Sequence, residues 1–298
     1  SSISYLFAFY YTPYYLKDRT EEGGMKKFVL KHENVEYQGY FAEAGKPKAS
    51  IAVLHGIGEH FGRYERFAHY MAEHGCSVYG IDLPGHGKSP GIRGQIGKRE
   101  DFYNLVDELA SYVKNEVPGV PMFLMGHSMG GNLALSYRLA RKETHFKAFI
   151  ISSPWIKLAG APSLLAHFIS LIAALVAPNL TIDNRIKADK LFTPSDEVSD
   201  EAKPDNLCHP FITPRTAADC FKWARIILKN AAVERRPVYL MHGSADSICS
   251  VEGSREFAAA AGDMCTYREW EGLKHELLNE VCWKDVANEI LVWIEMQI

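Results

Sequence analysis

The chain lacks the sequence patterns that are typical of nucleic-acid-binding and membrane-spanning proteins. Its 33 Lys and Arg residues nearly balance 36 Asp and Glu residues, which leaves a net charge of −3, and no block of basic residues stands out. This balance argues against a nucleic-acid partner and against a basic patch for a membrane surface. The main apolar run, residues 164–176, is shorter than the roughly 18 residues that a transmembrane helix needs. The sequence also contains no internal repeat and no low-complexity region.

The cysteines of the chain form no recognisable pattern. None of them occurs in a C-x-x-C pair. Cysteines scattered in this way indicate reduced thiols, most of them small core residues, in a reducing compartment. We therefore expect a cytoplasmic protein. The six are Cys76, Cys208, Cys220, Cys249, Cys265 and Cys282.

The first 24 residues differ in composition from the rest of the chain. Aromatic residues dominate residues 5–15, and an acidic, glycine-rich stretch follows. The segment has neither the basic start nor the small-residue cleavage site of a signal peptide, and it is too short and too polar to span a membrane. We expect residues 1–24 to be an unusual leader or an appended segment that the chemistry does not require, with Met25 as the natural start.

From residue 25 onward, apolar runs of strand length alternate with longer amphipathic stretches. The middle strands are continuously apolar, as in residues 51–54, which is typical of strands covered on both faces of a sheet. Strands that alternate with helices predict a mostly parallel sheet with right-handed crossovers, an α/β fold. The expected strands are 28–31, 37–43, 50–55, 77–82, 122–127, 148–152, 238–242 and 266–270. The expected helices are 64–74, 99–116, 132–142, 251–261 and 281–297.

Residues 155–235 interrupt this alternation. The segment contains the apolar run 164–176 and then becomes polar and rich in proline. It predicts a helical cap inserted between a first core part, residues 25–154, and a second core part, residues 236–298. Its apolar helix either packs on the core or forms a lid that lines an acyl-chain pocket and contacts lipid surfaces.

The stretch Gly126-His127-Ser128-Met129-Gly130 matches the pattern G-x-S-x-G. It follows an expected strand and precedes an expected helix, which is the context of a nucleophile elbow. Such a sharp turn strains the serine backbone and requires glycine at both flanks. It also presents the serine hydroxyl beside the positive end of a helix. We therefore predict Ser128 as a nucleophile; the alternative is a plain glycine-rich turn.

A serine hydroxyl needs a base, and in this strand–helix order a carboxylate and then a histidine follow the serine along the chain. Asp246 and His275 each lie just past the end of an expected strand, so both should reach the carboxyl edge of the sheet near Ser128. We expect His275 to take the Ser128 proton and return it to the leaving group. Asp246 would hold the imidazole tautomer and stabilise the imidazolium. Asp263, in a turn nearer the histidine, is the main rival to Asp246.

Other titratable residues fit these roles less well. His127 adjoins the nucleophile, and we expect its side chain to point elsewhere. His242 lies within a strand just before the proposed acid. Asp82 also ends an expected strand but precedes the serine, and we expect its loop to brace the site.

The tetrahedral intermediate of such a reaction needs two backbone N–H donors. One donor comes from the residue after the nucleophile, which is Met129. The other should come from the loop after an earlier strand, where Ile57 fits. We therefore predict an oxyanion hole formed by the amides of Ile57 and Met129.

The string H-G-I-G-E-H-F-G-R-Y at residues 55–64 resembles the monoacylglycerol lipase/lysophospholipase branch of the α/β-hydrolases. Four further stretches match the wider superfamily, namely residues 85–89, 126–130, 243–246 and 271–275. The resemblance extends from about residue 30 to the C-terminus. It implies an α/β-hydrolase fold and cleavage of a single acyl chain from a glycerol-like alcohol, with neither a cofactor nor a metal. The family's triad positions match Ser128, Asp246 and His275, and its oxyanion-hole positions match Ile57 and Met129.

The resemblance also concerns residues around the triad. Glu59 and Arg63 match positions near the alcohol pocket, although a buried salt bridge that braces the oxyanion loop is an alternative role. Cys249 matches a cysteine near the catalytic acid on which thiol reagents can act in mammalian members. The chain departs from those members at Leu278, where they have a histidine. The cap shows little similarity beyond its apolar helix and residues 178–180.

Together these features predict a serine ester hydrolase that cleaves a monoacylglycerol or lysophospholipid through an acyl-enzyme intermediate. Its partner would be a small lipid ester, with transient contact between the cap and a membrane or micelle. The main alternative is a broad carboxylesterase for short-chain or aromatic esters, followed by a peptidase or amidase. A ligand receptor that keeps the pocket without hydrolysis is a further alternative. The sequence does not define the oligomeric state.

Overall fold

The computed structural model describes residues 17–18, 24–160, 171–184, 186–193 and 205–298. Most of the expected leader, residues 1–16 and 19–23, lies outside the described residues. The same holds for residues 164–170 of the expected cap helix and for residues 194–204.

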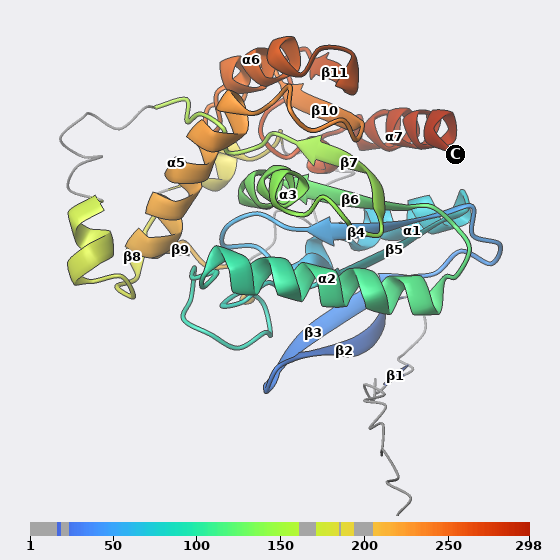
Figure 1. Cartoon of the computed structure of the whole chain (residues 1–298), viewed down its shortest axis with the longest axis horizontal. Helices are drawn as coiled ribbons and strands as arrows, with labels where there is room; N and C mark the ends of the chain where they lie inside the picture. Colours follow the sequence, from blue (N-terminus) through green and yellow to red (C-terminus); the bar gives the residue numbers. More distant parts are fainter. Residues whose placement is uncertain (1–16, 19–23, 161–170, 185, 194–204) are drawn as a thin grey trace, which may run out of the picture.

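A nine-stranded sheet forms the centre of the molecule (Figure 1). Its strands are β1 (Lys17–Asp18), β2 (Lys26–His32), β3 (Val35–Ala42), β4 (Ala49–Leu54), β5 (Cys76–Ile81), β6 (Met122–His127), β7 (Phe146–Ser152), β10 (Val238–Gly243) and β11 (Cys265–Trp270). They lie in the order β1-β2-β3-β5-β4-β6-β7-β10-β11. In this order the first three pairs, β1-β2, β2-β3 and β3-β5, are antiparallel. All pairs from β5-β4 to β10-β11 are parallel. The predicted α/β class and all eight expected strands are confirmed.

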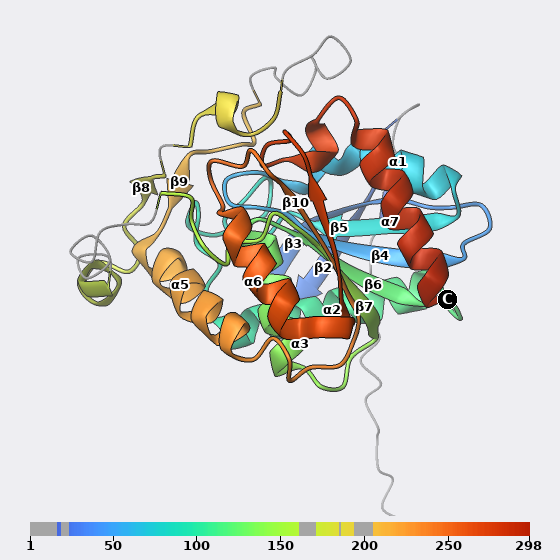
Figure 2. The same ribbon diagram turned by 90° about the horizontal axis from the view of Figure 1, so that it is seen from above.

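Helices cover both faces of the sheet (Figures 1 and 2). The five expected helices are α1 (Glu65–Glu73), α2 (Arg99–Glu116), α3 (Met129–Ala140), α6 (Val251–Ala261) and α7 (Trp283–Gln297). Their buried side chains divide into two cores, one with α2, α3 and α6 and the other with α1 and α7. Along β4, Ala52 and Leu54 belong to the first core, whereas Ile51 and Val53 belong to the second. Alternate side chains point to opposite faces and both faces are covered, so residues 51–54 of this strand are all apolar.

Between β7 and β10 the chain leaves the sheet. Residues 171–176 are helical, and the short strands β8 (Ile182–Asp183) and β9 (Phe211–Ile212) pair antiparallel. The helix α5 (Pro214–Lys229) then returns to the core and packs against α3. In Figure 1 these elements lie together at one end of the sheet. No helix in the described part of the chain combines the length and the apolarity that crossing a membrane requires.

The helix α5 is absent from the elements expected from the sequence, because the frequent prolines suggested irregular structure. Pro214 is in fact the first residue of the helix, a position where proline has no hydrogen bond to lose. Thr213 caps the helix, since its Oγ1 accepts from the Thr216 N–H at 3.3 Å. The Thr-Pro pair was therefore a helix-start signal in the sequence.

Candidate active site

Ser128 lies in the turn between β6 and α3, with its backbone in the left-handed region at φ 53° and ψ −114°. A side chain at Gly126 would collide with the backbone of Gly130, and one at Gly130 would collide with the backbone of Leu54. Glycine is therefore required at both positions by the close packing of the turn. The strained turn has the form of a nucleophile elbow.

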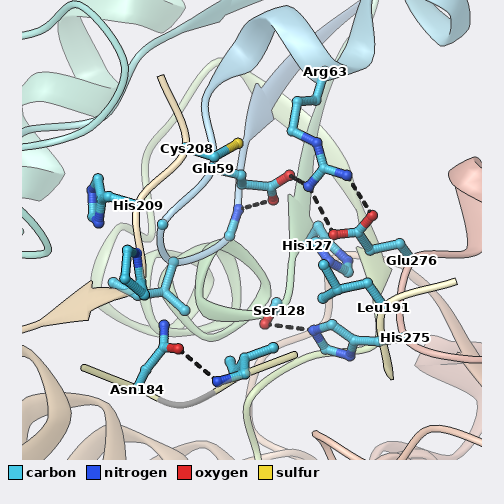
Figure 3. A pocket seen from close by; sticks show the side chains of 15 residues that line it. Glu59, Arg63, His127, Ser128, Asn184, Leu191, Cys208, His209, His275 and Glu276 are labelled. Atoms are coloured by element: carbon cyan, nitrogen blue, oxygen red, sulfur yellow. Dashed lines mark hydrogen bonds and ion pairs between the residues drawn. The ribbon is translucent and has the colours of Figure 1, made fainter. Parts of the chain in front are cut away.

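A chain of hydrogen bonds connects Ser128, His275 and Asp246. Asp246 follows β10 and His275 follows β11, and these strands are parallel neighbours, so their carboxyl ends meet at one edge. His275 Nε2 lies 2.9 Å from Ser128 Oγ, a contact drawn in Figure 3, and His275 Nδ1 lies 2.6 Å from Asp246 Oδ2. Because Nδ1 faces a carboxylate, it carries the ring proton and leaves Nε2 to accept from the serine hydroxyl. Asp263, the rival acid, is exposed in the short 3-10 helix Gly262–Met264.

Asp246 is buried and receives hydrogen bonds on both carboxylate oxygens. Its Oδ1 accepts from the backbone N–H groups of Ile248 at 2.7 Å and Cys249 at 3.0 Å. Its Oδ2 accepts from His275 and also from His242 Nε2 at 3.0 Å. Burial by itself raises the pKa of this carboxyl, but the hydrogen bonds from His242 and His275 outweigh it and hold the pKa well below its usual value. The contact with His242 was not anticipated from the sequence.

The loop after β4 lies beside the elbow. A Cβ atom on Gly56 would lie 3.2 Å from Ser128 Cβ, and the next residue, Ile57, lines the cavity at Ser128. Among the described residues, the amide of Ile57 donates no backbone hydrogen bond. Met129 is the first residue of α3, so its amide has no partner within the helix. Two free amides near one serine are what the predicted oxyanion hole requires.

A cavity of about 280 Å³ opens at Ser128 (Figure 3). One wall belongs to the core and is formed by the loop after β4, the elbow and the turn that carries His275. The other wall comes from segment 155–235, through Asn184, Ile186, Leu191, Cys208, His209 and Pro210. A substrate in this cavity would therefore contact both parts of the chain.

Three charged side chains lie at one end of the cavity (Figure 3), and two of them, Glu59 and Glu276, are buried. Arg63 donates to both carboxylate oxygens of Glu276, at 2.8 and 2.7 Å, and its Nη1 lies 3.4 Å from Glu59 Oε2. Glu59 also accepts from the backbone N–H of Gly56 and from the Tyr64 hydroxyl. Burial raises the pKa of Glu59; burial acts on Glu276 in the same direction, but Arg63 outweighs it and lowers that pKa to about 2. Glu59 and Arg63 thus form a salt bridge that braces the loop after β4, and both also line the cavity.

The side chain of His127 points in a direction that differs from the one expected from the sequence. We expected its side chain to point elsewhere, but the ring lines the cavity and its centroid lies 4.7 Å from that of His275. His127 is the last residue of β6, where the chain begins to turn, so strand alternation does not decide its direction. Burial, reinforced by the nearby His275, lowers the pKa of His127 to about 3, so the ring is neutral near pH 7.

Two other side chains singled out from the sequence, Cys249 and Asp82, have structural roles. Cys249 is 1% exposed, and burial followed by the nearby Asp246 raises the pKa of its thiol well above the usual value. The thiol is therefore protonated and shielded in this conformation. Asp82 accepts from the backbone N–H groups of Phe61 at 2.9 Å and Lys88 at 2.8 Å, which confirms the expected bracing role of its loop.

One group of potential metal ligands lies at the edge of the cavity. The donor atoms of His60, Asp205 and Cys208 lie within 4.8 Å of one another. However, His60 Nδ1 accepts from the Gly62 N–H at 3.1 Å, so the ring proton is on Nε2, which lies 2.5 Å from Asp205 Oδ2. The nitrogen that would bind a metal therefore donates a hydrogen bond instead. We interpret this group as a link between the core and segment 155–235.

Comparison with known proteins agrees with this geometry. A family described as serine aminopeptidase, S33, matches residues 45–281. A monoglyceride lipase from Rattus norvegicus is 32% identical over 274 residues, covering 87% of this chain and 86% of that protein. An uncharacterised abhydrolase domain-containing protein from Dictyostelium discoideum is 32% identical over 255 residues, or 85% of this chain, which spans only 27% of that protein. The crystal structure of Paleococcus ferrophilus monoacylglycerol lipase is 28% identical with a TM-score of 0.77, covering 87% of this chain and 99% of that one.

The family match extends over most of the chain, from the loop before β4 to the residues just before α7. The matched region contains the elbow, both later strand ends and the segment between β7 and β10. The chain therefore belongs to the serine aminopeptidase S33 family of the α/β-hydrolase fold, and it is a carboxylic ester hydrolase.

Proposed function

We propose that the protein cleaves the fatty-acyl ester of a monoacylglycerol or lysophospholipid, with Ser128 as the nucleophile. The observation that carries this proposal is the hydrogen-bonded chain from Ser128 through His275 to Asp246, at the base of a cavity. The similarity to a rat monoglyceride lipase supports a lipid ester as the substrate.

In the first half of the reaction, Ser128 Oγ attacks the ester carbonyl carbon while His275 Nε2 takes the hydroxyl proton. The carbonyl oxygen gains negative charge and accepts from the amides of Ile57 and Met129. Loss of one such donor typically raises the barrier by about 3 kcal/mol. The intermediate then collapses, the bond to the alcohol oxygen breaks, and His275 returns its proton to the departing alcohol. The acyl group remains on Ser128.

In the second half, water replaces the alcohol. His275 takes a proton from the water, whose oxygen attacks the acyl carbonyl carbon. The bond to Ser128 Oγ breaks, the serine recovers its proton from His275, and the fatty acid leaves. Asp246 remains ionised throughout and stabilises the imidazolium formed in both halves. No metal or cofactor is needed for these steps.

Glu59 and Arg63 lie at the polar end of the cavity, and we assign them contacts with the alcohol part of the substrate. A glycerol-like alcohol has hydroxyl groups that can donate to a carboxylate and accept from a guanidinium. The two residues would also keep their bracing role, because Glu59 holds the loop that carries Ile57.

Segment 155–235 would act as a cap between the core parts 25–154 and 236–298. Two observations support this role. The segment lines one wall of the cavity. It also has an exposed apolar patch, which we assign to transient contact with a membrane or micelle. The members of this patch are Leu171, Ile172, Leu175, Val176, Leu180 and Ile182. Six free cysteines favour a reducing, cytoplasmic location.

A panel of esters that varies the acyl chain from butyryl to oleoyl, and the alcohol from p-nitrophenol to glycerol and glycerophosphocholine, tests the proposal. We expect medium or long acyl chains to be preferred. Ser128→Ala should lower kcat by up to about 10⁶-fold. Rates that collapse above butyryl would favour a short-chain carboxylesterase, and turnover that survives Ser128→Ala would refute the assignment of the nucleophile.

A further inference from the structure

His242 is a second histidine in contact with the proposed catalytic acid. It belongs to β10, four residues before Asp246, and its side chain is completely buried. Its Nε2 lies 3.0 Å from Asp246 Oδ2 and 3.2 Å from the backbone oxygen of Cys249. Both of these atoms are acceptors, so Nε2 must carry the ring proton and donate it. The other nitrogen, Nδ1, lies 2.7 Å from the hydroxyl of Ser254 in α6, from which it accepts.

The position of His242 excludes it from acting as the base itself. Both of its nitrogens are engaged, one with Asp246 and Cys249 and the other with Ser254. It is not among the residues that line the cavity. By contrast, His275 reaches Ser128 Oγ with its Nε2. Any effect of His242 on the reaction must therefore pass through Asp246.

We propose that His242 is a positioning residue that holds Asp246 Oδ2 against His275. Asp246 Oδ1 is fixed by two backbone amides, and Oδ2 is shared by the two imidazoles. A carboxylate can rotate about its Cβ–Cγ bond, and the His242 N–H restricts that rotation from the side opposite the backbone amides. The proton on Nε2 is in turn favoured by Ser254, which donates to Nδ1 from α6.

Because of this arrangement, loss of the His242 N–H should lower the rate of the reaction. Without the His242 N–H, Oδ2 is free to shift away from His275 Nδ1, and the buried carboxylate loses a charge-assisted hydrogen bond. Small displacements of a catalytic group can reduce turnover by roughly ten- to hundredfold. Because His242 does not line the cavity, substrate binding should be unaffected.

The test compares His242→Gln with His242→Asn. The side-chain amide of Gln can reach the place of Nε2 and donate to Asp246, whereas the shorter amide of Asn reaches only the place of Nδ1, near Ser254. Both variants are polar, uncharged and smaller than His. We expect His242→Gln to retain most of kcat on p-nitrophenyl butyrate and His242→Asn to lose roughly ten- to hundredfold in kcat with an unchanged KM. His242→Leu, which has no donor, should behave like His242→Asn.

Rates should be expressed per active site, counted by complete labelling of Ser128 with a fluorophosphonate. Leu109→Ala in α2 is the control for general loss of stability, since Leu109 is fully buried in the core and does not line the cavity. It should leave kcat per active site unchanged. If His242→Leu does not fold, the comparison of Gln with Asn still decides the question. Equal kcat values for those two variants, or a change in KM alone, would overturn the proposal.

The inference rests on the roles proposed above for Ser128, His275 and Asp246. Its failure can be told apart from theirs by including Ser128→Ala in the same series. Activity that survives Ser128→Ala would overturn the proposed nucleophile. Equal rates for the Gln and Asn variants, with Ser128→Ala inactive, would overturn only the role of His242.

Discussion

At the scale of single residues, the carboxylate of Asp246 is held by four hydrogen-bond donors in a buried site. The donors outweigh the effect of burial, so the pKa of Asp246 stays well below its usual value. An ionised carboxylate is what the reaction requires, because it must stabilise the imidazolium of His275 in both halves.

Asp246→Asn should lower kcat by about 10⁴-fold, because an amide that donates to His275 Nδ1 stabilises the wrong tautomer of the ring. The matched control is Asp263→Asn, which removes the exposed carboxylate of the rival acid. The measurement is kcat on p-nitrophenyl butyrate for both variants. A larger loss for Asp263→Asn would show that the acid is misassigned.

The buried imidazole of His86 should make the stability of the folded protein depend on pH. It is fully buried, its Nδ1 donates to the Pro84 carbonyl oxygen at 2.9 Å, and its Nε2 has no hydrogen-bond partner among the described residues. Burial lowers the pKa of His86 from 6.5 to about 3. Between these two values the unfolded chain binds a proton that the folded chain does not. Stability is therefore lost as the pH falls below 6.5, by about 1.4 kcal/mol per pH unit for this residue.

His86→Asn separates this contribution from those of other groups. Asn can still donate to the Pro84 carbonyl but cannot titrate. The slope of the unfolding free energy against pH, measured by urea denaturation between pH 4.5 and 6.5, reports how many protons the chain takes up on unfolding. In His86→Asn this number should be lower by about one. An unchanged slope would mean that His86 is protonated in the folded protein.

At the scale of elements, the site depends on where strands end. Ser128, Asp246 and His275 follow β6, β10 and β11, and these parallel strands deliver their carboxyl ends to one edge of the sheet. The strand and helix patterns were predictable because each face of the sheet imposes its own apolar positions. The exception is α5, whose prolines obscured a helix that begins at Pro214.

Thr213→Ala tests the cap of α5. The change removes the side-chain acceptor for the Thr216 N–H and should lower the free energy of unfolding by about 1 kcal/mol. Thr213→Ser keeps the hydroxyl and should retain most of the stability. Urea denaturation of both variants provides the measurement. Equal losses for Ala and Ser would show that the methyl group, and not the cap, stabilises this end of the helix.

At the scale of the whole molecule, the exposed apolar patch of residues 171–182 lies at one end of the fold and α7 lies at the other (Figures 1 and 2). The patch and the inner wall of the cavity belong to the same segment. This shared segment is the basis for the proposed transfer of a lipid from a membrane at the patch to Ser128.

The double variant Leu175→Glu/Val176→Glu should separate surface contact from chemistry. These side chains are 82% and 77% exposed, so their replacement should not disturb the core. We expect unchanged hydrolysis of soluble p-nitrophenyl butyrate and a loss of about tenfold or more on a long-chain monoacylglycerol in phospholipid vesicles, since two apolar side chains can no longer enter the lipid.

Val292→Glu/Met296→Glu on α7 is the matched control. These two side chains are also exposed and apolar, at 58% and 67%, but they belong to α7, which lies at the opposite end of the molecule from residues 171–182. Their replacement should leave both activities unchanged. Equal losses on vesicles for the two double variants would argue against contact through the patch.

Much of the fold and the candidate site could be predicted from the sequence. The G-x-S-x-G turn specifies its own geometry, because only glycine fits beside the strained backbone of Ser128. The order of strands along the chain then limits the base and the acid to the ends of later strands, which selected His275 and Asp246. The same rule placed the second oxyanion donor in the loop after an earlier strand, which indicated Ile57, and the resemblance to a known branch of hydrolases matched that residue.

The tertiary structure decided which side chains surround these groups. His242 shares Asp246 with His275, and His127 turns into the cavity beside His275. Glu276 accepts hydrogen bonds from both terminal nitrogens of Arg63. Such contacts depend on the register between neighbouring strands and on the path of the loops beyond them, which local sequence does not encode. The sequence by itself therefore determined the elements and the reacting groups. Only the packing of distant segments decided how those groups are held and charged.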